Sequence, residues 1–333
     1  MKDYLVDVPV KINIWIRSEC QKRQLEVLRQ ARPSVIFLIS DGGRTEQEWQ
    51  IINENRAMVE QGIDWNCTVY KLYMDHNNGL YGTMTQMFDL VWSKVDRCIF
   101  LEDDDLPAVT FFRFCKELLD RYENDLRICC ICGCNILEKW EPTSADYFFS
   151  RQGSIWGIAT WKRVYEEYND YEYGKDPYVM NLLRKRTRHN PTFWNRIKGY
   201  ATDKVYKGHI AGDEFFLEFA VYGRHQLQIV PKYNMISNIG CTNDAEHSDA
   251  LEDLPKGVRR MFNMKIYELD GEVKHPKYII PDGEFEKARN KVVGYNTPFI
   301  NLGRKTERLM RKLLKGDFKY IFSKLKQRIN GEK

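Results

Sequence analysis

The sequence predicts an α/β fold built on a doubly wound, mostly parallel sheet. Through the first 135 residues, apolar runs of strand length alternate with segments of helical periodicity, as in sheets with helical crossovers. One such run, Cys98–Leu101, ends in four carboxylates, Glu102–Asp105, and Pro107 then blocks continuation of the strand. From about residue 140 the alternation loosens, which predicts a less regular lobe that completes the same domain.

The expected elements follow one another at the spacing of strand–helix–strand units. Pro33 ends the first helix, and Thr45 with Glu48 forms a capping box at the start of the second. Strands are expected at Val10–Ile16, Ser34–Ile39, Thr68–Tyr73, Cys98–Leu101, Arg127–Cys132 and Leu227–Val230. Helices are expected at Glu19–Gln30, Thr45–Gln61, Leu80–Ser93, Val109–Tyr122 and Asp213–Tyr222.

Composition sets broad limits on the class of protein. Of 333 residues, 43% are hydrophobic and 29% are charged, and no apolar segment approaches the ~20 residues needed to span a bilayer. The first residues, Met1–Tyr4, have no apolar signal-peptide core. Nine cysteines fit reduced thiols better than a disulfide framework in a chain of this length. We therefore expect a cytosolic protein.

Positive charge is concentrated at the C-terminus. The formal net charge is +4, but residues 301–333 hold eleven Lys or Arg against three acids, which leaves the remainder near −4. The body is therefore not expected to bind nucleic acid. Apolar residues recur at helical spacing in this tail, which predicts an amphipathic helix over 304–329, interrupted near Gly316. The main domain would cover residues 1–300, with halves at 1–135 and 136–300, and residues 301–333 would form the basic helix.

The carboxylates of Glu102–Asp105 repel one another and are best tolerated where a cation lies among them. They follow a buried strand, and an open α/β sheet binds ligands at the carboxyl ends of its strands. Mg²⁺ and Mn²⁺ prefer hard oxygen ligands and commonly take one or two carboxylates together with substrate phosphates. The pattern predicts a metal–diphosphate site, and a solvated acidic turn is the alternative.

Polar residues also follow the first two strands. Arg17 and Ser18 come after the first, and Asp41-Gly-Gly-Arg44 after the second, so both segments reach the same sheet edge as the carboxylates. An aspartate there can accept a hydrogen bond from a nucleobase. Asn77–Gly82 leads into a helix whose N-terminus can hold an anion. It lacks the Gly-Lys-Ser/Thr of a phosphate-binding loop, and a simple helix start fits equally well.

Three further features have both structural and chemical interpretations. Cys129–Cys134 contains four cysteines without a second ligand pair nearby, so core packing is expected rather than zinc. Asp213 and Glu214 begin a helix, where the helix dipole favours carboxylates, and either could instead act as a general base. His247 could add a nitrogen ligand to a metal, although a lone histidine is more often structural.

Several segments occur in a particular order along the chain. They are Asp41–Arg44, Leu101–Pro107, Phe111–Phe114, Ser154–Arg163, Val230–Pro231, Ser237–Gly240 and His247. This order resembles a bacterial family of GT-A nucleotide-sugar glycosyltransferases, often labelled hemolytic-protein-like, over about residues 8–260. The Glu-Asp-Asp element at 102–104 is also similar to that of animal N-acetylglucosaminyltransferase I.

The resemblance implies a GT-A fold whose second half forms the acceptor side, with a metal and a donor pocket in the first half. Asp104 would ligate Mn²⁺ or Mg²⁺, joined by His247 and by an additional carboxylate from Asp105. Glu102 and Asp103 would lie nearer the nucleotide. The rest of the donor pocket would comprise Arg17, Ser18, Asp41, Arg44, Gly79, Tyr81 and Gly82, with Asp41 on the base.

On the acceptor side, Asp213 falls where inverting relatives place the catalytic base. Gly212 stands where the family has tryptophan and Glu214 follows, so the choice between the two carboxylates stays open. Trp156 and Gly157 would contact the acceptor. The implied function is inverting, metal-dependent transfer of a sugar from a nucleotide donor, preferably a UDP-sugar. The acceptor would be a hydroxyl of a glycan or lipid-linked molecule in surface-polysaccharide synthesis.

Two other functions fit parts of the pattern. A sugar nucleotidyltransferase also combines an α/β sheet with carboxylate-held Mg²⁺, but it usually has an N-terminal Gly-rich loop with Lys or Arg, which Val10–Arg23 lacks. A catalytically silent membrane or polysaccharide-binding protein could retain only the fold.

The basic tail is expected to lie on an anionic bilayer, peripherally on the inner face of the cell membrane. A helix docked on the body or on a second copy is the alternative.

Overall fold

An eight-stranded sheet forms the centre of the computed structural model, which describes residues 2–166, 172–188, 191–201, 213–241, 251, 254–295, 297–314 and 316. The strand order is β3-β2-β1-β4-β8-β6-β9-β7. The strands are β1 (Val6–Asn13), β2 (Pro33–Ser40), β3 (Thr68–Tyr73), β4 (Arg97–Leu101), β6 (Ile128–Cys132), β7 (Tyr147–Ser150), β8 (Ile158–Trp161) and β9 (Leu227–Pro231). β7 and β8 pair antiparallel with their neighbours, and the other pairs are parallel. The prediction of an α/β fold with a mostly parallel sheet is confirmed.

The direction in which strands are added reverses at β1. β2 and β3 extend the sheet on one side of β1, and the chain then returns to place β4 on the other side. A reversal of this kind leaves a crevice outside the carboxyl ends of the two strands. The segments that follow β1 and β4 therefore meet at one point of the sheet edge.

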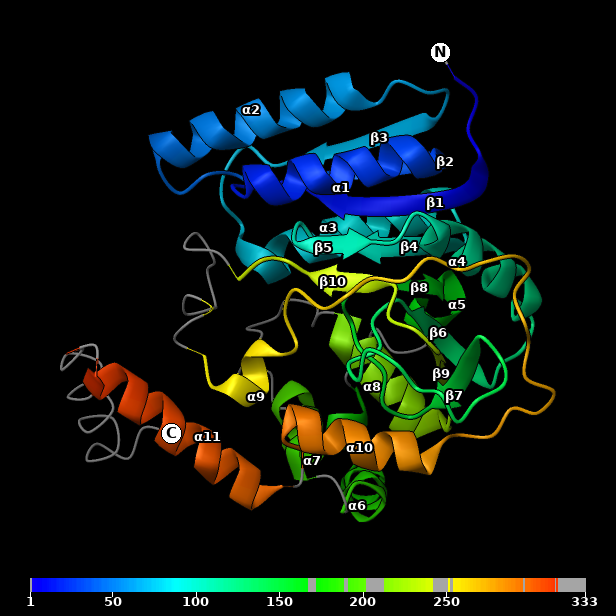
Figure 1. The fold of residues 1–333 in the computed structure, drawn as a ribbon, viewed down its shortest axis with the longest axis vertical. Coiled ribbons are helices and arrows are strands. Elements are labelled where there is room, and N and C mark those ends of the chain that lie inside the picture. Colours follow the sequence, from blue (N-terminus) through cyan, green and yellow to red (C-terminus); the bar gives the residue numbers. More distant parts are fainter. Residues whose placement is uncertain are drawn as a thin grey trace.

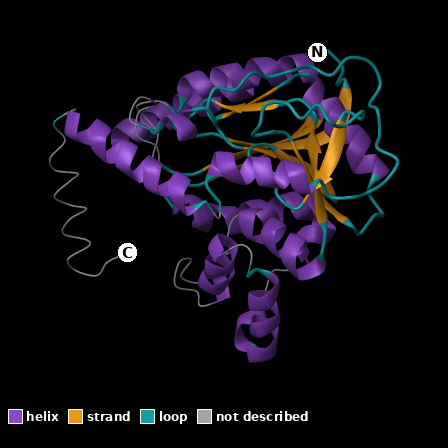
Figure 2. Ribbon diagram, turned by 60° about the horizontal axis from the view of Figure 1, so that its bottom comes forward, coloured by secondary structure: helices purple, strands orange, loops and turns teal. Residues whose placement is uncertain are grey.

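Helices lie on both sides of the sheet (Figure 2). They are α1 (Ser18–Ala31), α2 (Glu46–Gly62), α3 (Gly79–Lys94), α4 (Thr110–Arg121), α5 (Lys162–Glu166) and α8 (Asp213–Arg224). Phe88 and Trp92 of α3 pack on Phe100 of β4 and on Tyr165 of α5. α4 packs against β1, β4, β6 and β8. The central strands are consequently shielded on both faces, as in other mostly parallel sheets.

The second half of the chain completes the same sheet, since it supplies β7, β8 and β9. It also contains a short 3₁₀ helix (Glu172–Lys175), α6 (Pro177–Arg186), α7 (Pro191–Ala201), α9 (Lys256–Arg259), α10 (Gly283–Val293) and α11 (Pro298–Leu314). In Figure 1, α6, α7, α10 and α11 lie at the end of the molecule opposite α2. α11 begins before the predicted C-terminal helix, and residues 317–333 lie outside the described residues. Among the helices described, none has the length and apolar character to cross a bilayer.

A two-stranded ribbon stands beside the sheet edge. β5 (Asp105–Pro107) pairs antiparallel with β10 (Ile236–Asn238), and Asn238 lies opposite Asp105. This pairing brings the Ser-Asn-Ile-Gly segment at 237–240 directly against the acidic turn, although the two are more than a hundred residues apart in sequence. The fold thus makes neighbours of two segments that are separate in the sequence.

Two local predictions differ from the structure in detail. β1 ends at Asn13 instead of Ile16: the Ile14 N–H makes a last bond to the Ile39 carbonyl at 2.7 Å, and the chain then turns toward the crevice. Thr45 caps α2 as predicted, since its Oγ1 accepts from Glu48 N at 3.2 Å. The Glu48 carboxylate, however, accepts from Arg44 N at 2.7 Å.

The cysteines of β6 and its extension belong to the core. Cys129, Cys130, Cys132 and Cys134 are all buried, and every cysteine of the chain is a free thiol. The expectation of core packing is confirmed for this cluster.

Replacing the cap of α2 tests the local assignment. Thr45→Ala removes the acceptor of the Glu48 N–H and is expected to lower the free energy of unfolding by about 1 kcal/mol, measured by urea denaturation. Thr45→Ser keeps a hydroxyl at this position and should retain most of the stability. Equal losses in the two variants would show that the hydroxyl does not stabilise the helix.

Candidate functional site

A cavity of about 410 Å³ lies at the crevice between β1 and β4. Cavities of this volume are typical of small-molecule sites. Its walls come from the ends of β1, β2 and β4, from the start of α3 and from the segment after β10. Its polar and charged lining residues include Lys11, Asn13, Arg17, Asp41, Asn77, Glu102, Asp103, Asp104 and Asn238. The structure thus brings together Arg17, Asp41 and three of the four predicted carboxylates.

Arg17 joins the two loops that meet at the crevice. Its Nη1 donates to Asp103 Oδ1 and to Asp104 Oδ2, each at 2.8 Å. All three side chains are largely shielded, with 11–14% of each exposed. Burial alone would lower the pKa of Arg17, but the charges of Asp103 and Asp104 outweigh it and the pKa is raised. Arg17 therefore stays charged and ties the end of β1 to the acidic turn.

Asp104 is held from its other side by the segment after β10. Ile239 N donates to the Asp104 carbonyl at 2.9 Å, and Asn238 lines the cavity beside Asp104 and acts to lower the pKa of its carboxyl group. Gly240 packs on that carboxylate so closely that a Cβ would lie 2.0 Å from Oδ2. Asp104 Oδ1 is buried without a hydrogen-bond partner. A buried acceptor without a donor is unfavourable unless a ligand satisfies it.

The charge of Arg17 does not fully offset the cost of burying the Asp103 and Asp104 carboxylates. Burial raises the pKa of Asp103 to about 6, although the Arg17 charge opposes the shift. Burial also raises the pKa of Asp104, against the effects of Arg17 and Asn238. The loss of solvation thus outweighs the ion pairs at both groups. A further cation would stabilise the charged form of each carboxylate.

Asp105, expected as an additional metal ligand, does not line the cavity. Its Oδ2 accepts from Glu102 N at 3.1 Å and from Gly157 N at 2.9 Å, and the residue is buried. Burial and the charges of Glu102 and Asp104 raise its pKa well above the usual range. These two hydrogen bonds hold the Asp105 carboxylate inward, where it fixes the turn.

Asp41 lines the cavity but also holds the neighbouring loop. Its Oδ1 accepts from Gly42 N and Asn78 N, both at 2.9 Å, and its Oδ2 accepts from the Asn77 side chain at 3.2 Å. Gly79 starts α3 with a φ of +70°, a value that favours glycine, and it also lines the cavity. The start of α3 and the end of β2 therefore form one wall.

Several residues predicted for the donor pocket lie outside the cavity lining: Ser18, Arg44, Tyr81 and Gly82. Arg44 forms an ion pair with Glu48, Nη2 to Oε1 at 2.6 Å. Its guanidinium carbon also lies 4.8 Å from the ring centroid of Trp15, which does line the cavity. Arg44 thus contacts the cavity wall through Trp15.

Of the two predicted acceptor residues, Trp156 lines the cavity and Gly157 does not. Trp156 lines the cavity beside Phe262, with ring centroids 5.4 Å apart. Gly157 is buried and has a φ of +60°, and a Cβ there would lie 2.4 Å from Ile236 Cδ1. Gly157 therefore serves the close packing of the ribbon on the sheet, and only Trp156 is available to a ligand in the cavity.

Sequence reasoning missed a buried lysine at the cavity. Lys11 in β1 is 4% exposed, and its Nζ donates to Asn13 Oδ1 at 3.2 Å and to the Leu101 carbonyl at 3.3 Å. A buried ammonium is costly unless its charge is compensated or used. The signal was a lysine between Val10 and Ile12, since strands covered on both faces are normally apolar throughout.

The remaining predicted residues are less fully placed. α8 begins at Asp213, as expected for a helix start, but the structure does not describe the side chains of Asp213 and Glu214. His247 lies outside the described residues. Within the described residues, no three His, Cys, Asp or Glu side chains form a metal-binding group.

The charges around the cavity test whether a divalent cation fits. Four carboxylates, on Asp41, Glu102, Asp103 and Asp104, face only two cations, Lys11 and Arg17, which leaves a formal net charge of −2. Hard carboxylate oxygens and the unpartnered Asp104 Oδ1 suit Mg²⁺ or Mn²⁺. These ions often take only one or two carboxylates from the protein. The residues present therefore fit such an ion.

No family model and no curated protein matches the chain. Among solved structures, it is similar to a UDP-glucose pyrophosphorylase complexed with UDP-glucose, at 9% identity over 70% of this chain and 93% of that chain, with a TM-score of 0.37. It is also similar to 4-diphosphocytidyl-2C-methyl-D-erythritol synthase from Anaerococcus prevotii (9%, 70% and 91%, TM-score 0.36). A third is mouse xyloside xylosyltransferase 1 (13%, 67% and 84%, TM-score 0.36). Likeness at this level does not identify an activity.

Gly240 offers a direct test of the packing on Asp104. Gly240→Ala places a methyl group against the carboxylate and is expected to lower the free energy of unfolding by about 1–3 kcal/mol, measured by urea denaturation. Gly283→Ala is the matched control, because nothing lies within 4 Å of its added Cβ. Equal stability of the two variants would contradict the close approach of Gly240 to Asp104.

Proposed function

We propose that the protein is a metal-dependent transferase that uses a nucleotide-sugar donor, and that it is a glycosyltransferase. The observation that carries this proposal is the buried Asp104 carboxylate, which lines a cavity at the β1–β4 crevice and has one oxygen without a partner. The donor would be a UDP-sugar or a related nucleotide sugar. The acceptor would be a hydroxyl of a glycan or of a lipid-linked molecule, attacked with inversion.

The charge of the cavity explains why a metal would be required. A nucleoside diphosphate is itself anionic and would be repelled by a site of net charge −2. Asp104 and Asp103 would hold Mn²⁺ or Mg²⁺, and His247, which lies outside the described residues, would be a further ligand. The bound ion would act as a Lewis acid toward the diphosphate leaving group.

The chain's own residues would position the donor around these carboxylates. Lys11 lies at the cavity with its ammonium group and would attract the phosphates, while Arg17 keeps Asp103 and Asp104 in place. Asp41 and the start of α3 would receive the base. Trp156 and Phe262 form the aromatic wall on which a sugar ring can stack.

Transfer with inversion also requires a base for the acceptor hydroxyl. A carboxylate on the face opposite the leaving group would take that proton. Asp213 is our proposed base, from the resemblance to inverting relatives, and Glu214 is the alternative on the next position of α8.

Calorimetric titration with UDP tests the metal–nucleotide site. Wild-type protein is expected to bind UDP at least about tenfold more tightly with Mn²⁺ than without it. Asp104→Asn should bind UDP with Mn²⁺ only about as well as wild type does without the metal, because a ligand is lost. Asp270→Asn, an exposed carboxylate outside the cavity, should behave as wild type.

Assays on the same protein samples distinguish the proposed function from the alternatives. Failure of UDP, GDP and CDP to bind, or binding that is independent of Mn²⁺ and of Asp104, would contradict the proposed site. Release of pyrophosphate from a nucleoside triphosphate and a sugar 1-phosphate would instead identify nucleotidyl transfer. Metal-dependent binding without any transfer across a panel of nucleotide sugars and acceptors would indicate a binding protein.

Substitution at the start of α8 tests the proposed base. Asp213→Asn is expected to lower the transfer rate at least about a hundredfold while the dissociation constant of the nucleotide sugar changes little. Glu214→Gln is the matched control and should retain activity. The opposite result would assign the role to Glu214, and full activity of both variants would exclude this pair from proton transfer.

A further inference from the structure

The C-terminal helix α11 contacts the body with its polar side. Asn301 Nδ2 donates to the Gly294 carbonyl at 2.7 Å, and Arg304 donates to the carbonyls of Gly257 and Val292. Glu307 Oε1 accepts from Lys256 N at 3.0 Å, and Lys312 is buried. These residues recur every three to five positions, so they form one face of the helix. An amphipathic helix that packs on its own protein normally does so through the apolar face.

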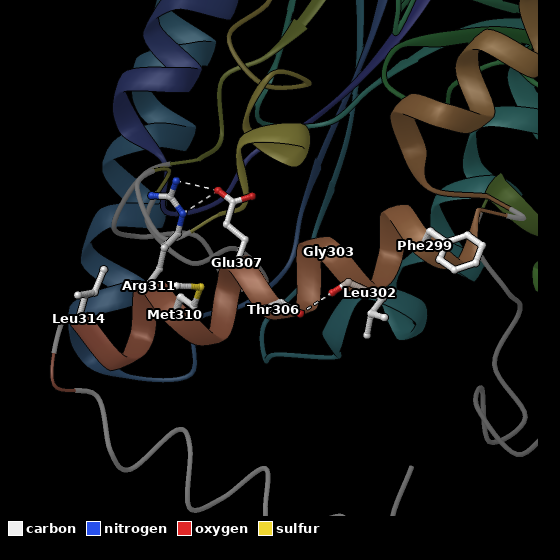
Figure 3. A pocket seen from close by; sticks show the side chains of 8 residues that line it. All are labelled: Phe299, Leu302, Gly303, Thr306, Glu307, Met310, Arg311 and Leu314. Carbon is white, nitrogen blue, oxygen red and sulfur yellow. Dashed lines mark hydrogen bonds and ion pairs between the residues drawn. The ribbon is translucent and has the colours of Figure 1, made fainter.

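The apolar face of α11 is consequently turned to solvent. Its members, at helical spacing, are Phe299, Leu302, Leu309, Met310, Leu313 and Leu314. Phe299 is 87% exposed and Leu314 is 86% exposed, at opposite ends of the helix. Figure 3 shows Phe299, Leu302, Met310 and Leu314 along the helix, where the Glu307–Arg311 ion pair borders the same hollow. We call this surface the α11 apolar face. Contiguous exposed apolar surface of this kind marks an interaction site.

Positive charge is concentrated on α11 and beside it. α11 carries five Lys or Arg and one acid, and Lys256, Arg259 and Arg260 at α9 lie next to its polar side. Lys305 is exposed on α11 itself. The whole segment 301–333 has eleven basic residues against three acidic ones. An apolar stripe bordered by positive charge is the pattern of helices that lie in the plane of an anionic membrane surface.

We infer that the α11 apolar face docks the protein on an anionic lipid bilayer. Phe299, Leu302, Met310 and Leu314 would enter the boundary between headgroups and acyl chains, and the basic residues would contact lipid headgroups. A second copy of the chain is the less favoured occupant, because two α11 faces in contact would bring together two positively charged surfaces. This inference goes beyond the proposed function and does not depend on it.

Vesicle flotation of the full chain tests the inference. Wild-type protein is expected to float with vesicles of equal parts phosphatidylglycerol and phosphatidylcholine and to remain unbound with phosphatidylcholine alone. Raising the salt concentration should weaken the binding, because it screens the charges. The double variant Phe299→Ser with Leu314→Ser is expected to reduce the bound fraction about tenfold or more.

The matched control removes apolar surface elsewhere. Tyr278 and Ile280 are 64% and 68% exposed, and Tyr278→Ser with Ile280→Ser should float as wild type does. Unchanged circular dichroism and thermal unfolding of both double variants would show that each is folded. Absence of flotation by the wild type, or equal flotation of wild type and the α11 variant, would overturn the inference. So would a dimer seen by light scattering that the α11 variant dissociates, without vesicle binding.

Discussion

The arrangement of the site depends on placing two carboxylates next to each other out of water. Asp103 and Asp104 both form ion pairs with Arg17 and are shielded from water. Burial nevertheless raises the pKa of both carboxyl groups. Desolvation therefore wins over the ion pairs, in line with the general finding that a buried salt bridge does not repay the loss of hydration by itself. An additional cation would therefore stabilise the charged form of both carboxylates. The lining also holds four carboxylates against two basic side chains, so an anionic ligand needs a cation to accompany it.

The order of strands explains where these buried carboxylates lie. β4 returns to the side of β1 opposite β2, so the loops after β1 and β4 have no strand between them and can meet. Arg17 comes from the first loop and the carboxylates from the second. β10 then closes the far side through Asn238 and Gly240. Three segments that are distant in sequence thus enclose the ion-paired cluster of Arg17, Asp103 and Asp104.

Much of the fold and part of the site could be predicted because they follow from local pattern. Strand-length apolar runs and helical periodicity place most elements within a few residues, since burial imposes those periods. Arg17, Asp41, Asp103 and Asp104 could be proposed because each follows a parallel strand. Lys11 was missed, because a residue within a strand was taken as part of the core. The lysine between two apolar neighbours was itself the sign that one side of β1 opens to a cavity.

Sequence alone determined which side chains are polar, which are apolar and at what period they recur. The tertiary structure decided what each faces. Asp105 and Asp104 are adjacent carboxylates, but backbone N–H groups of Glu102 and Gly157 surround the first while the second lines the cavity. Helix α11 is amphipathic by sequence, but its hydrogen bonds to the body, at Gly257 and Gly294 among others, turn the polar side inward. Periodicity defines two faces of an element, and the orientation is set by the partners that fold against it.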